Sequence, residues 1–145
     1  IQQSLEETLG LTVELSVAGD TSLFIADRNE GNYDFFLGGW YSDYNDPLDF
    51  LYTNYTDAYG MSFGGYSNTD YDALADQLVG ETDMDKRLDI YKQMEQILLL
   101  DDCAFAPIYY ATKQVLLQNW VKDYRTSSFG ASAEFIWTYI DGKNQ

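Results

Sequence analysis

Histidine is absent from this 145-residue chain and cysteine occurs only once, which excludes several common kinds of chemistry. Without histidine there is no imidazole to serve as a general base or as a metal ligand. The single Cys103 cannot form an internal disulfide, and its place in an apolar run with Ala104 and Phe105 predicts a buried, inert thiol. No nucleophile–base pair, metal-ligand spacing or cofactor motif appears, so the sequence predicts a protein that is not an enzyme and needs no cofactor.

Positive charge is also scarce, with 8 basic residues against 24 acidic ones and a net charge of −16. Nucleic acid is therefore excluded as a partner, because its binding requires lysine and arginine. No stretch approaches the roughly 20 apolar residues of a membrane span. The chain starts at Ile1 inside a helical pattern, and we expect it to be a fragment of a longer protein.

The segment Gly38–Phe50 is the most informative part of the chain. It follows the apolar run Tyr33–Leu37, which is typical of a buried strand, and it continues as Trp40-Tyr41-Ser42-Asp43. Pro47 further along disfavours a helix through the residue before it. Aromatic and acidic side chains directly after a strand are expected at the carboxyl edge of a sheet, where open α/β folds bind ligands.

The first part of the chain has the pattern of an α/β unit. Helical spacing over Ile1–Leu9 ends at Gly10, and strict alternation over Leu11–Val17 predicts a half-buried strand. A short helix from Asp20 to about Asn29 then leads to the strand Tyr33–Leu37. Because a crossover helix of this length connects them, the two strands are expected to be parallel.

The second part contains two capped helices. From Tyr41 to Tyr66 the apolar residues follow neither helical nor strand spacing, which predicts a long loop. Such long loops are usually functional. Capping boxes at Ser67–Asp70 and Thr82–Asp85 open helices that end at Gly80 and near Leu100. Their expected apolar faces are Tyr71, Leu74 and Leu78 in the first, and Leu88, Tyr91, Met94, Ile97 and Leu98 in the second.

Extended structure is expected again towards the end of the chain. Ala104–Tyr110 contains a proline and is typical of an edge strand. Val115–Leu117 could pair beside it, and Glu134–Ile140 alternates weakly, as a last strand would.

Three groups of residues carry a resemblance to a known family. Their order and spacing match the family over roughly Gly10 to Ile140. The first group is Gly39-Trp40 with Ser42-Asp43-Tyr44-Asn45-Asp46-Pro47 and Phe50, and the second is Gly65-Tyr66-Ser67-Asn68 with Tyr71-Asp72, Leu74, Arg87, Tyr91 and Glu95. The third is Ala106-Pro107-Ile108-Tyr109-Tyr110. Together they resemble the carboxy-terminal lobe of the peptide-binding (family five) extracellular solute-binding proteins, which deliver peptides to ABC importers.

The resemblance implies a fold and a cellular setting. Residues 1–145 would be a single domain and most of one periplasmic-binding-protein-like lobe, of α/β class, with a mixed, partly parallel sheet and flanking helices. The partners it implies are a peptide ligand, an amino-terminal lobe outside this chain and a membrane permease. The full-length protein would lie in the periplasm or, lipid-anchored, on the extracellular face of the cell membrane.

The resemblance also implies a binding site at Gly39, Trp40, Tyr41, Ser42 and Asp43. Asp43 matches an aspartate that binds the ammonium of a peptide, and the backbone around Gly39–Tyr41 would pair with the peptide main chain. From the residues alone, Asp43 could instead cap a turn, and Trp40 and Tyr41 could equally be core residues.

The carboxylates Asp43, Asp46 and Asp49 suggest other kinds of site. A glycoside hydrolase needs two carboxylates about 5–10 Å apart, but these acids crowd one short turn. A calcium loop counted from Asp43 fails, because Pro47 and Leu48 occupy its fifth and sixth positions. A carbohydrate-binding module or sugar-binding protein that stacks sugars on aromatic rings is the alternative function.

Overall fold

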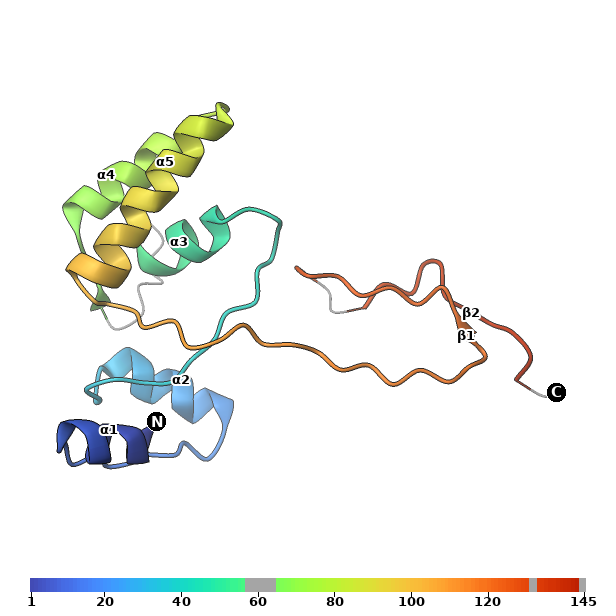
Figure 1. The fold of residues 1–145 in the computed structure, drawn as a ribbon, viewed down its shortest axis with the longest axis horizontal. Coiled ribbons are helices and arrows are strands. Elements are labelled where there is room, and N and C mark those ends of the chain that lie inside the picture. The colour runs from blue at the N-terminus through green and yellow to red at the C-terminus, as the bar shows by residue number, and fades with distance from the viewer. Residues whose placement is uncertain (57–64, 131–132, 144–145) are drawn as a thin grey trace. The chain divides into compact units, whose positions relative to one another are not determined.

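The computed structural model describes residues 1–56, 65–130 and 133–143, and it divides the chain into two compact units (Figure 1). The first unit is Ile1–Leu37 and the second is Gly38–Gln145. Within the described ranges, no helix has the length and apolar character needed to cross a membrane.

The first unit contains the two helices that the sequence predicts. Helix α1 spans Gln2–Leu9, and helix α2 spans Thr21–Glu30. Gly10 ends α1 with a φ of 68°, a left-handed conformation that glycine adopts without strain. The Asp20 carboxylate begins α2 by accepting the backbone N–H of Leu23 at 2.9 Å.

The two strands expected in this unit are not formed. Leu11–Val17 and Tyr33–Leu37 have no strand assignment, and among the described residues the only sheet has two strands, both near the end of the chain. A strand requires a neighbour to pair its N–H and C=O groups. The expectation of a parallel pair was therefore wrong for this chain, and its apolar side chains are left exposed at Leu11, Leu15, Val17, Phe35 and Leu37.

The second unit is built on a group of helices that we call the helical cluster. It consists of α3 (Leu48–Tyr55), α4 (Thr69–Leu78), α5 (Met84–Glu95) and η3 (Gln96–Asp101), a π-helical continuation of α5. The expectation of an irregular loop over Tyr41–Tyr66 was wrong in part, because helix α3 lies within this stretch. Pro47 stands directly before it, a position where proline is well tolerated.

Helices α4 and α5 begin where the sequence predicts, but their caps differ from the first residues of the expected capping boxes. The Asn68 side chain accepts the N–H groups two and three residues further on, at 2.9 and 3.0 Å. Asp83 does the same for α5, at 3.0 and 3.2 Å. In each box the second residue, rather than the first, is the cap.

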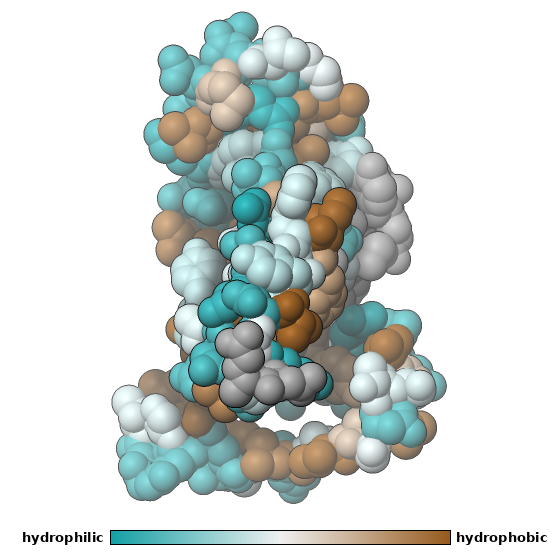
Figure 2. All heavy atoms as spheres, turned by 90° about the vertical axis from the view of Figure 1, so that its right-hand side faces the viewer, coloured by the Kyte–Doolittle hydropathy of each residue, from teal (hydrophilic) through white to brown (hydrophobic). Residues whose placement is uncertain are grey.

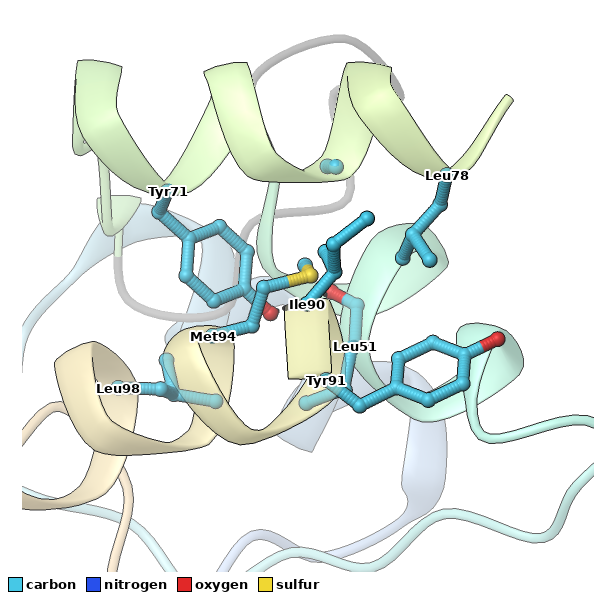
Figure 3. Packing of buried hydrophobic residues seen from close by; sticks show 8 residues of the cluster. Leu51, Tyr71, Leu78, Ile90, Tyr91, Met94 and Leu98 are labelled. Atoms are coloured by element: carbon cyan, nitrogen blue, oxygen red, sulfur yellow. Dashed lines mark hydrogen bonds between the residues drawn. The ribbon is translucent and has the colours of Figure 1, made fainter. Parts of the chain in front are cut away.

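The core of the second unit lies between these helices (Figure 3). Tyr71 and Leu78 point from α4 towards Met94 of α5, and the Tyr71 hydroxyl donates to the Leu51 carbonyl of α3 at 2.8 Å. The expected apolar faces are thus confirmed for most of their residues. The buried hydrophobic residues are Leu51, Tyr71, Ala75, Leu78, Ile90, Tyr91, Met94 and Leu98.

The prediction of the buried face of α5 was wrong for one residue, Leu88. Leu88 is 51% exposed, whereas Ile90, two positions later, is buried. Because α3 and α4 both pack against α5, the buried stripe is shifted around the helix from the one that the spacing of five apolar residues predicts.

The chain ends in a short antiparallel pair. Strand β1 (Val121–Lys122) pairs with β2 (Tyr139–Ile140), and Arg125 forms a single bridge with Glu134. The expected strand Glu134–Ile140 is confirmed only at its last two residues.

The segment between the helical cluster and this pair is exposed along its length, and we call Ala104–Leu117 the exposed segment. Neither expected strand within it is formed. Cys103, just before it, has a φ of 49° and an exposed side chain, so the expectation of a buried thiol was wrong. The cysteine belongs to the turn that closes η3, where the next N–H donates to the Leu98 carbonyl at 2.9 Å. Figure 2 shows apolar side chains of the chain, in brown, exposed among hydrophilic ones.

Candidate functional site

The five predicted site residues, Gly39–Asp43, lie in one continuous irregular stretch that begins to bend at Asp43, near the start of the second unit, and we call this stretch the site turn. Its first residue is open, because a Cβ added to Gly39 would meet no atom within 4 Å. The backbone at this position can therefore be approached by another chain, as main-chain pairing requires.

A buried carboxylate holds the turn from the inside. Asp49, in the first turn of α3, is 1% exposed. Its Oδ2 accepts the indole N–H of Trp40 at 2.7 Å and the backbone N–H of Asp43 at 3.2 Å. Trp40 is half-buried, so its indole nitrogen serves the scaffold while part of the residue stays accessible.

Two side chains of the turn face outward. The Tyr41 ring is 63% exposed, and the Lys113 ammonium lies 5.1 Å from its centroid, within the range of a cation–π contact. Asp43 is also exposed, and within the described part of the chain its carboxylate accepts no hydrogen bond. That carboxylate is thus presented to solvent by a backbone that is held in place.

A second segment supports the turn from further along the chain. The Ser42 carbonyl accepts the N–H of Gly130 at 2.7 Å, and the Ser42 hydroxyl donates to the Tyr44 carbonyl. Gly130 has a φ of 63°, and a Cβ there would lie 3.4 Å from the Asp43 carbonyl oxygen. Glycine therefore fits both the left-handed backbone and the close approach to the turn.

Asp46, three residues after the site turn, connects this part of the chain to α5. Its Oδ2 accepts from Arg87 Nη2 at 2.8 Å, and its Oδ1 accepts from the Tyr91 hydroxyl at 2.5 Å and from the Leu48 N–H at 2.8 Å. Burial opposes ionisation of Asp46, but the bonds from Tyr91 and Leu48 and the charge of Arg87 outweigh it and lower the carboxyl pKa. Burial and the neighbouring Asp46 raise the pKa of Tyr91 to about 12.

Arg87 also joins two helices. Its Nη1 donates to the carbonyl of Leu78, the last residue of α4, at 3.3 Å and to the carbonyl of Glu81, in the connection to α5, at 3.1 Å. Carbonyl groups at a helix end lack partners within the helix, and an arginine supplies them together with a favourable charge. One side chain thus connects α4, α5 and the segment after the site turn.

The sequence reasoning missed the roles of Asp49 and Arg87. Arg87 precedes Tyr91 by four residues and so lies on the buried stripe of α5, where a cation requires partners. Asp49 stands between apolar residues of a helix that the sequence pattern did not reveal. The contacts of Asp46, to the Leu48 N–H and to Arg87, are structural, and they hold the turn at Asp46-Pro47.

No other site competes with this one in the described residues. They contain no group of three or more acidic or sulfur side chains arranged to hold a metal. The two best-defined surface hollows, of about 300 and 380 Å³, lie on α4 and α5 and include no residue of the site turn.

Comparison with known proteins identifies the family to which the chain belongs. Residues 1–62 match the family described as bacterial extracellular solute-binding proteins, family 5, middle region. The chain is 30% identical over 119 residues to the periplasmic oligopeptide-binding protein OppA of Escherichia coli, covering 82% of this chain and 21% of that protein. It is 33% identical over 119 residues to the dipeptide-binding protein DppE of Bacillus subtilis, with 82% and 21% covered.

A solved structure supports the same assignment. The substrate-binding domain of an oligopeptide ABC transporter from Bacillus anthracis matches with a TM-score of 0.82 and 25% identity, over 96% of this chain and 27% of that one. The fold is therefore consistent with that of periplasmic peptide-binding proteins, although the described residues are mostly helical with one two-stranded sheet. The chain belongs to the family 5 bacterial extracellular solute-binding proteins, and it spans about a fifth of the length of the curated relatives it matches. This family is not the one expected for a carbohydrate-binding module, the alternative function.

Proposed function

We propose that residues 1–145 are a single domain that forms most of the carboxy-terminal lobe of a longer solute-binding protein. That protein captures oligopeptides or dipeptides and delivers them to an ABC importer. Membership of the family supports this, together with the similarity to proteins whose names describe oligopeptide and dipeptide binding.

The site turn is the part of this chain that meets the peptide. Asp43 binds the amino-terminal ammonium, and the open backbone at Gly39 pairs with the peptide main chain, which tolerates any side-chain sequence. Trp40, Tyr41 and Ser42 surround the first peptide residue. The observation that carries the proposal is the exposed Asp43 carboxylate, because it is presented by a turn that Asp49 holds in place.

The wider mechanism is capture without catalysis. The amino-terminal lobe, outside this chain, closes over the peptide about a hinge, and the permease recognises the closed form. The protein works in the periplasm or on the extracellular face of the membrane, where a lipid anchor retains it. It needs no cofactor.

The test is calorimetry of the full-length protein with a tripeptide and with the same tripeptide N-acetylated. Asp43→Asn removes the charge and keeps the shape of the side chain. A charge-assisted hydrogen bond of about 1.5–3 kcal/mol predicts that the free-amino tripeptide weakens roughly 10- to 150-fold. Asp76→Asn, at an exposed carboxylate of α4, is the matched control and should change neither affinity.

The two peptides separate a ligand role from a structural one. If Asp43 holds the ammonium, the N-acetylated peptide binds weakly to both the wild type and Asp43→Asn, with nearly equal affinities. An equal loss for both peptides would mean that Asp43 only supports the fold. Binding of an oligosaccharide in place of both peptides would favour the carbohydrate alternative.

A further inference from the structure

The least exposed charged residue beside the site turn is Asp49, which lies in the first turn of α3. An acidic side chain is rarely buried to this extent unless it is paired or hydrogen-bonded. Asp49 receives two N–H donors on one oxygen, and its place in the first turn of α3 puts the negative charge at the favourable end of the helix dipole.

The two donors come from either end of the part of the turn that faces a ligand. Trp40 donates through its side chain, and Asp43 donates through its backbone. Tyr41 and Ser42 lie between them, and the Ser42 carbonyl is fixed separately by Gly130 at 2.7 Å. The turn is therefore held by two backbone groups and one side chain, while the side chains of Tyr41 and Asp43 remain exposed.

Such an arrangement matters for affinity because a flexible turn would have to be ordered when the ligand binds. Ordering a turn on binding subtracts from the affinity, and a turn that is already ordered avoids this loss. The Asp49 oxygen lies 3.2 Å from the Asp43 nitrogen, so a change at Asp49 is transmitted to Asp43 through a single hydrogen bond.

We propose that Asp49 is a positioning residue for ligand binding, which sets the affinity for a free-amino ligand by holding Trp40 and the Asp43 backbone in place. This inference rests on the proposed function, because it assigns the ammonium to Asp43. Asp49 itself, being buried, does not touch the ligand.

The experiment measures peptide affinity of the full-length protein by calorimetry, with Asp49→Asn and Asp49→Glu. The asparagine variant keeps the shape but replaces the carboxylate by a neutral amide, whose single oxygen accepts the two N–H donors more weakly. The glutamate variant keeps the charge and moves it by one methylene group. Each should weaken the free-amino tripeptide by about tenfold, which equals about 1.4 kcal/mol. Asp76→Asn should have no effect.

A double-mutant cycle distinguishes positioning from a general loss of structure. If Asp49 acts through Asp43, then Asp49→Asn should cost much less affinity in the Asp43→Asn background than in the wild type. Losses that simply add, or full affinity in Asp49→Glu together with a loss in Asp49→Asn, would overturn the inference. The second result would show that charge alone matters, and the glutamate variant keeps the test open if the asparagine variant does not fold.

The outcome for Asp43→Asn alone separates this inference from the proposed function. If Asp43→Asn does not discriminate the free-amino from the N-acetylated tripeptide, the ammonium assignment fails. If it does discriminate while the Asp49 variants bind as tightly as the wild type, only the positioning role fails.

Discussion

The helical cluster and the exposed segment are neighbours in sequence, but they differ in how their apolar side chains are buried. In the cluster, Tyr71, Ala75 and Met94 are fully buried at 0% exposure. In the exposed segment, Tyr110 and Leu116 are 96% and 100% exposed. Both regions are rich in apolar residues, so composition does not explain the difference.

The cause is where each region finds its hydrogen-bond partners. A helix pairs its own N–H and C=O groups, and the caps at Asn68 and Asp83 are local as well. An extended segment must pair with another strand, and its exposed apolar residues then become one face of a sheet. The cluster is therefore specified by local contacts, whereas the exposed segment has no paired strand among the described residues.

The largest expected effect separates the two regions directly. Met94→Ala removes a fully buried side chain and should lower the free energy of unfolding by about 2–5 kcal/mol, because it leaves a cavity between α4 and α5. Leu116→Ala is the matched control and should change it by no more than about 0.5 kcal/mol. Urea denaturation followed by far-ultraviolet circular dichroism measures both. Similar losses for the two variants would mean that the exposed segment is packed after all.

A smaller effect is expected where the cluster meets the segment after the site turn. Arg87→Met deletes the bonds to Asp46 and to the end of α4, and the loss of charge-assisted hydrogen bonds predicts a destabilisation of about 1.5–3 kcal/mol. Lys92→Met is the control, because Lys92 makes only an exposed ion pair with Asp89 at 3.7 Å. Equal effects of the two substitutions would argue that the Arg87 contacts add nothing to stability.

The same contacts predict a dependence on acid. Because the pKa of Asp46 is lowered from its ordinary value of 3.8, its ionised form stabilises the folded state above that pH. This contribution should be lost as the pH falls from 3.8 through the folded-state pKa. In Arg87→Met the part that depends on Arg87 should already be missing, so stability should fall less steeply over this range. A parallel decline in both proteins would assign the acid sensitivity to other carboxylates, such as Glu81, whose pKa is also lowered.

The parts of the fold that could be predicted from the sequence are those fixed by neighbouring residues. Gly10, Asp20 and the two capping boxes placed four helices correctly. Helix α3 was not predicted, because eight residues with one buried face give too few apolar repeats to show a period. The alternating runs were interpreted as strands, but alternation indicates only that a segment suits a sheet, not that its partner is in the same chain.

The candidate site also contains residues that the sequence could indicate and residues that it could not. Its outward residues, Asp43 and Tyr41, were assigned to a binding site by the family resemblance, whereas the residues alone left open a turn cap for Asp43 and a core position for Tyr41. The residues that hold it, Asp49 and Arg87, contact partners 6 to 41 positions away, and such contacts leave no local pattern. The sequence offered one signal for such a supporting residue, namely a charged side chain among the apolar positions of a helix face. This signal identifies Arg87.

The smallest expected effect on stability, at Cys103, also gives the most direct probe of the comparison. Because its side chain is exposed, Cys103→Ser should change the free energy of unfolding by no more than about 0.5 kcal/mol. The wild-type thiol in this 145-residue chain should react readily with a thiol reagent, because its side chain is exposed and its one hydrogen bond, to the Leu100 carbonyl, is long at 3.4 Å. In the longer protein that we propose, strands pairing with the exposed segment next to Cys103 should slow the reaction. Equal rates in both proteins would show that no strand covers this end of the exposed segment in the longer protein. The difference in burial between the helical cluster and the exposed segment would then be a property of the fold itself.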